Sequence, residues 1–301
     1  MSLDATVRGI RGRRDARGHG QEAAEPTADR GRLLELSDLT LAAYLRHLAT
    51  HGGSFVEDAG LLLACGPHPQ PNPYRNGALR LDDRLTVAEV ERRGREFFGD
   101  RHYALWVREH GDADLRAWAA RAGLRDLGRL PELMLDHLPE EPQIPDGVQL
   151  RQARDAQTQD DYLGLVSSAW GMGELSREIA AQIFFDPTSL DDENVAAFVA
   201  YYEDMPLSGA MTLVTHGVAL GCQGATLRKL RPGQRLPPPG PPGQRRGLAE
   251  TCLWMALKLS FEQLGAWCSL AQTSVLGAPA WLRLGYQPLT GYERYLVPAA
   301  S

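Results

Sequence analysis

The sequence has 301 residues, which is enough for about two globular domains. Its formal net charge of −6 and its hydrophobic content of 43% are typical of an ordinary globular protein and exclude a wholly disordered chain. Its 31 glycines and 20 prolines are too few for a collagen-like protein. The small negative net charge does not indicate a particular binding partner.

The cysteines and histidines are scattered along the sequence. The four cysteines are Cys65, Cys222, Cys252 and Cys268. None belongs to a Cys-x-x-Cys pair, so the sequence predicts neither a disulfide framework nor a zinc site. We therefore expect no bound metal and a reducing, cytoplasmic environment.

A stretch without Asp, Glu, Lys or Arg extends from Met205 to Leu227 and is long enough to raise the question of a membrane span. Glycines, a proline and polar residues divide it into short apolar runs. This pattern is typical of a buried antiparallel hairpin, so no membrane partner is expected.

Residues 1–34 are rich in arginine, glycine and alanine and lack the apolar core of a signal peptide. Acidic residues follow the arginines closely and no aromatic residue lies among them, which disfavours a nucleic-acid-binding tail. We expect these residues to form a flexible arm. The excess of arginine over lysine in the whole sequence favours a bacterial source with a genome rich in G and C.

Residues 35–137 are predicted to form a mixed α/β unit. A helix with Ser37 as its N-cap is expected to end at Gly52. Short strands and two amphipathic helices follow it. The expected strands are 55–57, 61–65, 79–81, 102–108 and 133–135, and the expected helices are 86–98 and 113–122.

The proline-rich residues 138–147 have no apolar period and are predicted to link two domains. A second domain, residues 148–301, follows, and its central strands are expected to form an antiparallel meander. Its expected strands are 148–152, 195–202, 208–215, 218–226, 267–272 and 286–297, and its expected helices are 155–170, 173–184, 246–264 and 275–284.

The two halves of the sequence end in a similar way. Placing Gly123 on Gly285, an offset of 162, pairs Arg121 with Arg283 and puts a strand, a helix and a glycine before a last strand in both halves. The match is short and favours a duplicated domain. An unrelated α/β cap is the alternative for the first half.

A short motif, Gln-Arg-Arg-Gly-Leu-Ala at residues 244–249, opens the longest predicted helix of the second domain. The first turn of a helix leaves backbone N–H groups unpaired and carries the positive end of the helix dipole, so it binds phosphate groups well. Gly247 would allow a phosphate to approach closely, and Ala249 adds no bulk. An ordinary arginine-rich helix start is the other interpretation.

Together with its surroundings, this motif resembles the acyl-CoA pyrophosphate motif of the GNAT superfamily of N-acetyltransferases. Gly-Ala-Thr-Leu at 224–227 precedes it, and its helix ends in Leu-Gly-Ala at 264–266. A second block, formed by residues 269–274, 277–286 and 292–296, is similar to the end of that fold, with a strand, a short helix, a Leu-Gly-Tyr turn and a last strand. The likeness covers about residues 148–298.

The resemblance implies an α/β (α+β) fold with a mixed, largely antiparallel sheet flanked by helices, in two tandem GNAT-like domains of which the first is degenerate. It implies a transferase, an N-acetyltransferase or other acyltransferase, that uses acetyl-CoA as its acyl donor. The acyl group would pass directly to a primary amine.

The resemblance also implies a set of cofactor-binding residues. The end of the strand at 218–226 would offer backbone groups to the pantetheine arm, and amides of 245–249 would hold the pyrophosphate. The implied cofactor-binding residues are Ala225, Thr226, Leu227, Gln244, Arg245, Arg246, Gly247, Leu248, Ala249 and Ser274. Ser274 is equally suited to cap the helix that follows it.

Two features depart from the family pattern. Residues 228–240 form an insert rich in proline and arginine, which is predicted to be a loop and could also dock a partner protein. Trp281 stands where many relatives carry the tyrosine that protonates the CoA thiolate, and an indole N–H is too weak an acid for that role. The catalytic residues are therefore unassigned. The nearby candidate acids are Tyr286, Tyr292 and Tyr295, each of which is equally suited to packing.

No general base is apparent. Glu203 and Asp204 are candidates by position alone, and a plain hairpin turn is the alternative. The first half has no counterpart of residues 244–249, because the helix expected at 86–98 begins without a glycine. CoA binding is therefore expected in the second half only.

We expect an acyl-CoA-dependent N-acyltransferase that acts on a small-molecule or peptide amine, as a monomer or homodimer and without a nucleic-acid partner. A non-catalytic acyl-CoA-binding or regulatory pseudo-acetyltransferase is the alternative that Trp281 and the insert motivate. A third possibility is an interaction protein that works through the proline-rich insert. The sequence does not identify the acceptor amine, because acceptor pockets are built from loops that share no common motif.

Overall fold

A computed structural model describes residues 29–70, 72–227, 247–274 and 277–299. Its strands form a single sheet of 11 strands in the order β1-β2-β3-β4-β11-β5-β10-β9-β8-β7-β6. The strands are β1 (Ser54–Asp58), β2 (Leu61–Cys65), β3 (Asn76–Arg80), β4 (Tyr103–Arg108), β5 (Arg125–Leu135), β6 (Val148–Gln152), β7 (Val195–Tyr202), β8 (Met205–Thr215), β9 (Val218–Thr226), β10 (Cys268–Gln272) and β11 (Gln287–Val297).

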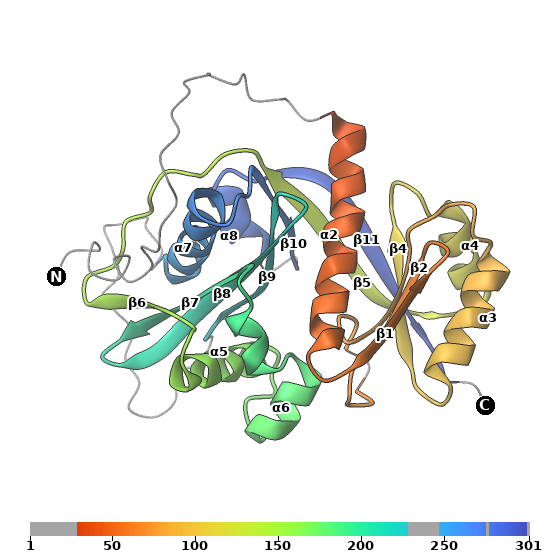
Figure 1. The fold of residues 1–301 in the computed structure, drawn as a ribbon, viewed down its shortest axis with the longest axis horizontal. Coiled ribbons are helices and arrows are strands. Elements are labelled where there is room, and N and C mark those ends of the chain that lie inside the picture. The colour runs from red at the N-terminus through yellow and green to blue at the C-terminus, as the bar shows by residue number, and fades with distance from the viewer. Residues whose placement is uncertain (1–28, 71, 228–246, 275–276, 300–301) are drawn as a thin grey trace.

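Helices cover both faces of this sheet (Figure 1). Within the described residues, no helix is both long and apolar enough to cross a membrane. The helices are α2 (Arg30–Thr50), α3 (Val87–Phe98), α4 (Ala113–Arg121), α5 (Ala156–Ala169), α6 (Arg177–Ile183), the 3-10 helix η2 (Pro187–Asp191), α7 (Leu248–Glu262) and α8 (Ala278–Arg283).

Each half of the chain places its last strand in the sheet of the other half. The first half, β1 to β5, sends β5 to pair with β10, and the second half, β6 to β11, sends β11 to pair with β4. The strands β5 and β11 also pair with each other at the centre of the sheet, where Figure 1 shows them crossing between the two groups of helices. The halves are therefore joined by an exchange of strands.

The exchange agrees with the internal repeat seen in the sequence. Shifting the bounds of β5 by 162 residues gives the bounds of β11. In both halves a strand and a helix precede a glycine with positive φ, which is 63° at Gly123 and 92° at Gly285. These glycines end their helices in a conformation that a residue with a side chain seldom adopts.

The helix α2 packs against both halves, and its start differs from the one expected at Ser37. It begins at Arg30, because the Asp29 side chain accepts a hydrogen bond from the Gly31 N–H and because Leu33 is buried against the core of the second half. Residues 30–34 are therefore helical and do not belong to a flexible arm. Another face of α2, with Leu41 and its neighbours, packs against β2 to β4.

The strand β5 is longer than the expected 133–135 because β11 pairs with it from Arg125 to Met134, whereas β10 pairs only with residues 132–135. It exchanges hydrogen bonds with β10 along one edge and with β11 along the other. Pairing with β11 thus makes a strand of a segment whose sequence, with Gly128 and Pro131 inside it, does not alternate as a strand should. The stretch without charges from Met205 to Leu227 is the expected antiparallel hairpin of β8 and β9.

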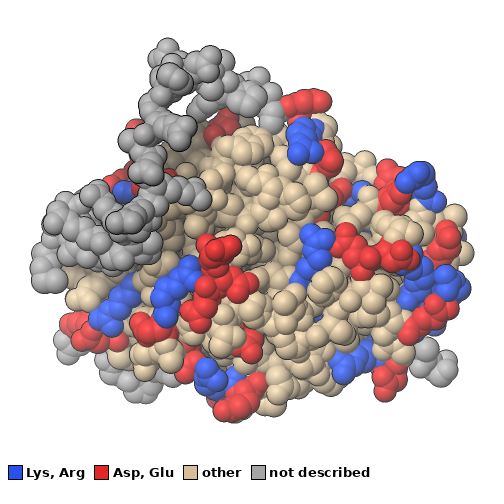
Figure 2. Space-filling view, in the orientation of Figure 1, with Lys and Arg blue, Asp and Glu red and all other residues tan. Residues whose placement is uncertain are grey.

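Charged side chains are mixed in sign over the face shown in Figure 2. Acidic and basic groups alternate around α3 and α4 and form no broad patch of one sign on that face. All four cysteines are free thiols, in line with the absence of a paired spacing in the sequence.

Candidate acyl-CoA site

The candidate site lies where β9 and β10 separate. These parallel strands pair from Val218 and Cys268 as far as Gly221 and Ala271. Beyond that point β9 stays with β8, and β10 turns to β5, where the Thr273 N–H donates to the carbonyl of Pro131 at 3.0 Å. The strand β9 therefore continues to Thr226 with its backbone on this edge unpaired by β10.

A β-bulge in β9 marks the start of the separated segment. The pairing of β8 and β9 shifts by one residue between Gly209 opposite Ala225 and Met211 opposite Cys222. Gln223 lies in this bulge with a φ of 50°, and its carbonyl accepts a hydrogen bond of 2.8 Å from the Tyr162 hydroxyl. Bulges of this kind redirect backbone groups and are common next to active sites.

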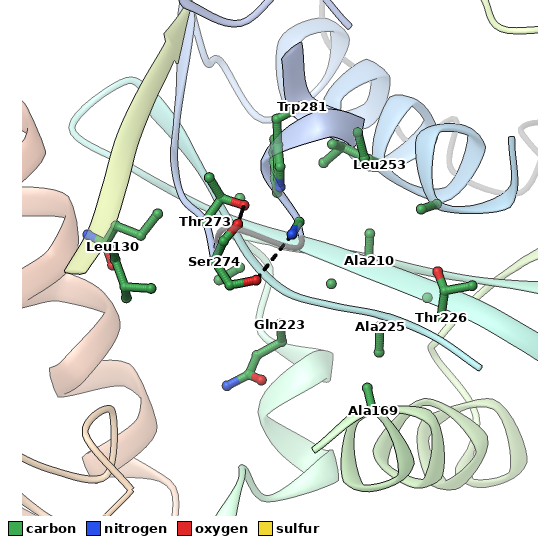
Figure 3. Close-up of a pocket in the computed structure, with 18 of the residues that line it drawn as sticks. Leu130, Ala169, Ala210, Gln223, Ala225, Thr226, Leu253, Thr273, Ser274 and Trp281 are labelled. Carbon is green, nitrogen blue, oxygen red and sulfur yellow. Dashed lines mark hydrogen bonds between the residues drawn. The ribbon is translucent and has the colours of Figure 1, made fainter. Parts of the chain in front are cut away.

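A cavity of about 690 Å³ occupies the gap between the strands, which is within the usual size of a small-molecule site, about 300–1,000 Å³. Its floor is built from small residues of β8 and β9, so the backbone is accessible to a ligand. In Figure 3, Trp281 and Leu253 lie on the side of α7 and α8, and Gln223 and Ala169 lie on the side of α5. The small lining residues are Gly209, Ala210, Gly221, Gly224 and Ala225.

The structure brings half of the sequence-predicted cofactor residues to the wall of this cavity. Those residues are Ala225, Thr226, Leu227, Ala249 and Ser274. Gln244, Arg245 and Arg246, together with the insert 228–240, lie outside the described residues. Their assigned role in binding CoA stays a prediction.

Gly247 and Leu248 lie at the start of α7, and neither is among the residues that line the cavity. Gly247 is the N-cap of α7 with a left-handed φ of 65°, a backbone conformation that favours glycine. Leu248 is buried in the core beneath the helix and does not line the cavity, because the first apolar position of α7 faces the sheet. Only its backbone can take part in a phosphate site.

Ser274 is not the N-cap of α8, as its alternative role predicted, because α8 begins at Ala278 and Gly277 is its N-cap. Its hydroxyl oxygen instead accepts a hydrogen bond of 3.1 Å from the N–H of this N-cap residue and so supports the turn before α8 (Figure 3). The neighbouring Thr273 hydroxyl donates to the carbonyl of Ser274. Both residues line the cavity, so this hydrogen bond does not remove Ser274 from the site.

The tyrosines near the C-terminus are directed away from the cavity. The Tyr286 hydroxyl pairs with Ser269, the Tyr292 hydroxyl with Ser37 and Asp38, and the Tyr295 hydroxyl with Glu293. Burial raises the pKa of both Tyr286 and Tyr292 above the ordinary value. None of the three lines the cavity, and none of them is a candidate general acid in this structure.

Glu203 and Asp204 form the turn between β7 and β8. Both have positive φ, 50° and 60°, as a tight hairpin turn of two residues requires. Asp204 forms an ion pair of 2.7 Å with Arg151. Neither residue lines the cavity, so the hairpin alternative describes them and a role as general base does not.

The far end of the cavity is built by residues that the sequence did not single out. Tyr74 from the loop before β3, Leu130 from β5 and Arg294 from β11 line it. Tyr74 is the only tyrosine among the described lining residues, and burial raises its pKa above the ordinary value. Its loop has no motif, so only the three-dimensional fold could have identified it.

Arg294 is a buried cation without a carboxylate partner among the described residues. Its guanidinium donates to the carbonyls of Leu127 and Gly128 at 3.0 and 3.3 Å and lies 5.6 Å from the centre of the Trp106 ring. No acidic residue is among the described residues that line the cavity. The far end of the cavity is therefore electropositive.

In the described residues of the first half, charged side chains lie at the corresponding strand ends. Its parallel strands β3 and β4 are related as β9 and β10 are, but a buried ion-pair network lies where they end. Arg80 and Arg108 both bind the buried carboxylate of Asp112, with Nε–O distances of 2.9 and 3.0 Å. These charged side chains occupy space that glycine and alanine leave open in the second half.

The helix α3 of the first half corresponds to α7, and its own side chains occupy the N-terminus where a phosphate group would bind. The N-terminus of α3 has a capping box in which Thr86 and Glu89 bind each other's backbone N–H groups. Hydrogen bonds from Thr86 hold the pKa of Glu89 below its usual value, so a negative charge occupies the helix start. This arrangement is consistent with CoA binding in the second half alone.

This chain is similar to known proteins in its three-dimensional structure. No family model and no curated protein matches the sequence. A GCN5-related N-acetyltransferase from Kribbella flavida has a TM-score of 0.59 at 17% identity, over 88% of this chain and 96% of that one.

Two further solved structures are similar over nearly their whole length. One is a tandem GNAT protein from the clavulanic acid biosynthesis pathway, with a TM-score of 0.53 at 15% identity, covering 89% of this chain and 97% of that one. The other, a GCN5-related N-acetyltransferase-like protein from Streptococcus suis, has a TM-score of 0.52 at 13% identity, covering 88% and 98%. The expected fold is thereby confirmed: the chain has the mixed, largely antiparallel GNAT fold in its tandem, two-domain form.

Proposed function

We propose that the protein is an acyl-CoA-dependent N-acyltransferase, with acetyl-CoA as the simplest donor, and that its second half carries the donor site. The observation that carries this proposal is the separation of β9 and β10 after Gly221 and Ala271, which opens a cavity beside the first turn of α7. A gap between parallel strands next to a helix N-terminus suits a ligand with both an extended arm and phosphate groups.

The donor would bind along the open edge of β9. Backbone groups of Ala225, Thr226 and Leu227 would pair with the pantetheine amides, and the first turn of α7, from Gly247 to Ala249, would face the pyrophosphate. A backbone N–H at the β9 bulge would polarise the thioester carbonyl. The predicted contacts of Gln244, Arg245 and Arg246 belong to the same proposal.

The acceptor would enter at the end of the cavity lined by Tyr74, Leu130 and Arg294. In the transfer, the amine nitrogen bonds to the carbonyl carbon of the thioester and the bond from carbon to sulfur breaks. We assign to the Tyr74 hydroxyl the proton that the departing thiolate takes up, and the proton that the amine nitrogen loses would restore the hydroxyl. The unpaired cation of Arg294 favours an acceptor that carries a carboxylate or another anionic group.

Turnover tests this proposal. Release of CoA thiol from acetyl-CoA would be measured over a panel of small amines and peptides, with each amino acid tested beside its carboxamide. We expect thiol release with a carboxylate-bearing amine, at least about tenfold above its carboxamide in kcat/KM, which is about 1.4 kcal/mol of transition-state binding. Tyr74→Phe is expected to lower kcat while leaving acetyl-CoA binding unchanged.

The alternative of a non-catalytic acyl-CoA-binding protein has a distinct outcome. Trp281 in place of a tyrosine is the observation that favours it. Binding of acetyl-CoA without thiol release over the whole panel would support this alternative and contradict catalysis. We further propose that the protein is bacterial and cytoplasmic. It would act as a monomer or homodimer on a small-molecule or peptide amine.

A further inference from the structure

Three side chains from distant parts of the sequence converge at the C-terminal end of α2, away from the acyl-CoA cavity. His47 lies in the last turn of α2 and His51 is its C-cap. Asp192 directly follows η2 in the second half. One ligand atom from each of the three lies within 4.8 Å of the other two.

The distances between these atoms suit a shared metal ion. Asp192 Oδ2 lies 3.2 Å from His47 Nδ1 and 3.1 Å from His51 Nε2. Two ligands bound to zinc at about 2.0–2.1 Å in a tetrahedral arrangement are separated by about 3.3 Å. The two observed distances are within a few tenths of an ångström of that separation.

The spacing of the histidines supports the same geometry. Residues four apart lie on one face of a helix, so His47 and His51 present their rings to the same side. The ring centres are 5.1 Å apart. Two histidines at this spacing form a chelating pair, which a carboxylate from another element completes.

Backbone contacts hold both parts of the cluster in place. Arg75 donates to the carbonyls of Leu48 and His51 and so fixes the end of α2. Arg154 donates to the carbonyls of Leu190 and Val195, each at 2.8 Å, on either side of Asp192. A site whose ligands are positioned by such neighbours needs little rearrangement to bind an ion.

The cluster is buried on one side and open on the other. The exposed fractions of the side chains are 7% for His47, 21% for His51 and 38% for Asp192. An ion could therefore enter from solvent and keep a water ligand. The buried Nε2 of His47 has no hydrogen-bond partner among the described residues with or without an ion, so this atom favours neither state.

We propose that His47, His51 and Asp192 bind a divalent cation of the zinc class, through two imidazole nitrogens and one carboxylate oxygen. This set of ligands suits Zn²⁺ and Co²⁺ better than Mg²⁺ or Ca²⁺, which take oxygen ligands. The bound ion would join α2 of the first half to the segment after η2 in the second half. The proposal is independent of acyl transfer, since none of the three residues lines the cavity.

Cobalt and zinc titrations of the chelator-treated full-length protein test the proposal. We expect one equivalent of Co²⁺ to bind with visible ligand-field absorption, and Zn²⁺ to displace it. His51→Ala and Asp192→Asn are each expected to weaken binding at least about tenfold. His216→Ala, which changes an exposed histidine in the turn between β8 and β9, is the matched control and should bind as the unchanged protein does.

Circular dichroism of each variant separates loss of the site from loss of the fold. A folded protein that binds no Co²⁺ would overturn the proposal, and the three residues would then form only a hydrogen-bonded cluster. Binding that persists unchanged in folded His51→Ala and Asp192→Asn would overturn it as well, because the ion would then lie elsewhere.

Discussion

Gly221 lies under the indole ring of Trp281 at the point where β9 and β10 begin to separate. A Cβ atom at this position would lie 2.2 Å from the Trp281 ring, which is far inside van der Waals contact. The ring fills the space above the strand because the glycine has no side chain. The same pair of residues forms part of the cavity wall, so packing and ligand binding are coupled there.

We predict that Gly221→Ala displaces Trp281, lowers the free energy of unfolding by about 1–3 kcal/mol and weakens acetyl-CoA binding. Chemical denaturation and calorimetry check the two effects. Gly224→Ala on the same strand is the matched control for stability, because a Cβ there would meet no atom within 4 Å. An equal loss of unfolding free energy in the two variants would contradict the packing argument.

Glu132 is a fully buried acid in β5, close to the polar groups of α2. Neither of its carboxyl oxygens has a hydrogen-bond partner among the described residues. Burial raises the pKa of this carboxyl well above its usual value, so the folded protein holds a proton that the unfolded chain releases. The stability contributed in this way is complete below the unfolded pKa of about 4.3 and is lost as the pH rises through the folded pKa.

Glu132→Gln keeps the shape of the side chain and removes its ionisation. We predict that the midpoint temperature of the variant rises relative to the unchanged protein as the pH increases from about 5 to about 8, by more than about 2 °C. Thermal unfolding at a series of pH values measures this difference. Glu193→Gln, at an exposed position before β7, is the control, and a parallel pH profile for both variants would refute the argument.

The sequence predicted best those residues whose role is local. The hairpin of β8 and β9 and the glycines that end α4 and α8 follow from spacing and turn chemistry, and the structure agrees. Tyr74 and Arg294 line the cavity only because the exchanged strands bring their segments to it. His51 and Asp192 are 141 residues apart, so no pattern in the sequence could place them together.

At the scale of the elements, the exchange of β5 and β11 decides how the molecule is held together. The strand β11 lies between β4 and β5 and pairs with both, and β5 pairs with β10 on its other edge. Spacing and turn residues predicted most elements and their order. They could not predict this exchange, because a strand's partners depend on contacts between residues far apart in the chain.

We predict that neither residues 1–147 nor residues 148–301 fold stably alone, because each fragment would leave the edge of a central strand unpaired. The two fragments expressed together are expected to form a complex with the circular dichroism of the intact chain. Size-exclusion chromatography and thermal unfolding of each fragment check this. Cooperative unfolding of either fragment by itself would contradict the account.

A cut in the connecting segment 136–147 gives a second test of the same point. A protease site inserted there should be cleaved without separating the two parts, and separation should require denaturant. This experiment also tests the predicted linker at residues 138–147 and the division into domains at 35–137 and 148–301, which stay predictions of the sequence.

At the scale of the whole molecule, the two halves differ at the ends of their parallel strands. The second half has a cavity beside the first turn of α7, whereas Arg80, Arg108 and Asp112 fill the corresponding region of the first half. The first half instead supplies Tyr74 and Leu130 to the far end of that cavity. We infer that one half keeps the donor site and the other has become part of the acceptor pocket.

The most direct test of this account is a calorimetric titration of the full-length protein with acetyl-CoA and with CoA, repeated with Ala249→Glu. Ala249 lines the cavity in the first turn of α7, and a carboxylate there would repel the phosphates. Ala117→Glu, at an exposed position of α4, is the matched control.

The account predicts one binding site with a Kd between about 1 μM and 1 mM, weakened at least about tenfold in Ala249→Glu and unchanged in Ala117→Glu. A folded protein that binds neither ligand, or one whose affinity is the same in all three forms, would contradict the assignment of the cavity between β9 and β10 as the acyl-CoA site.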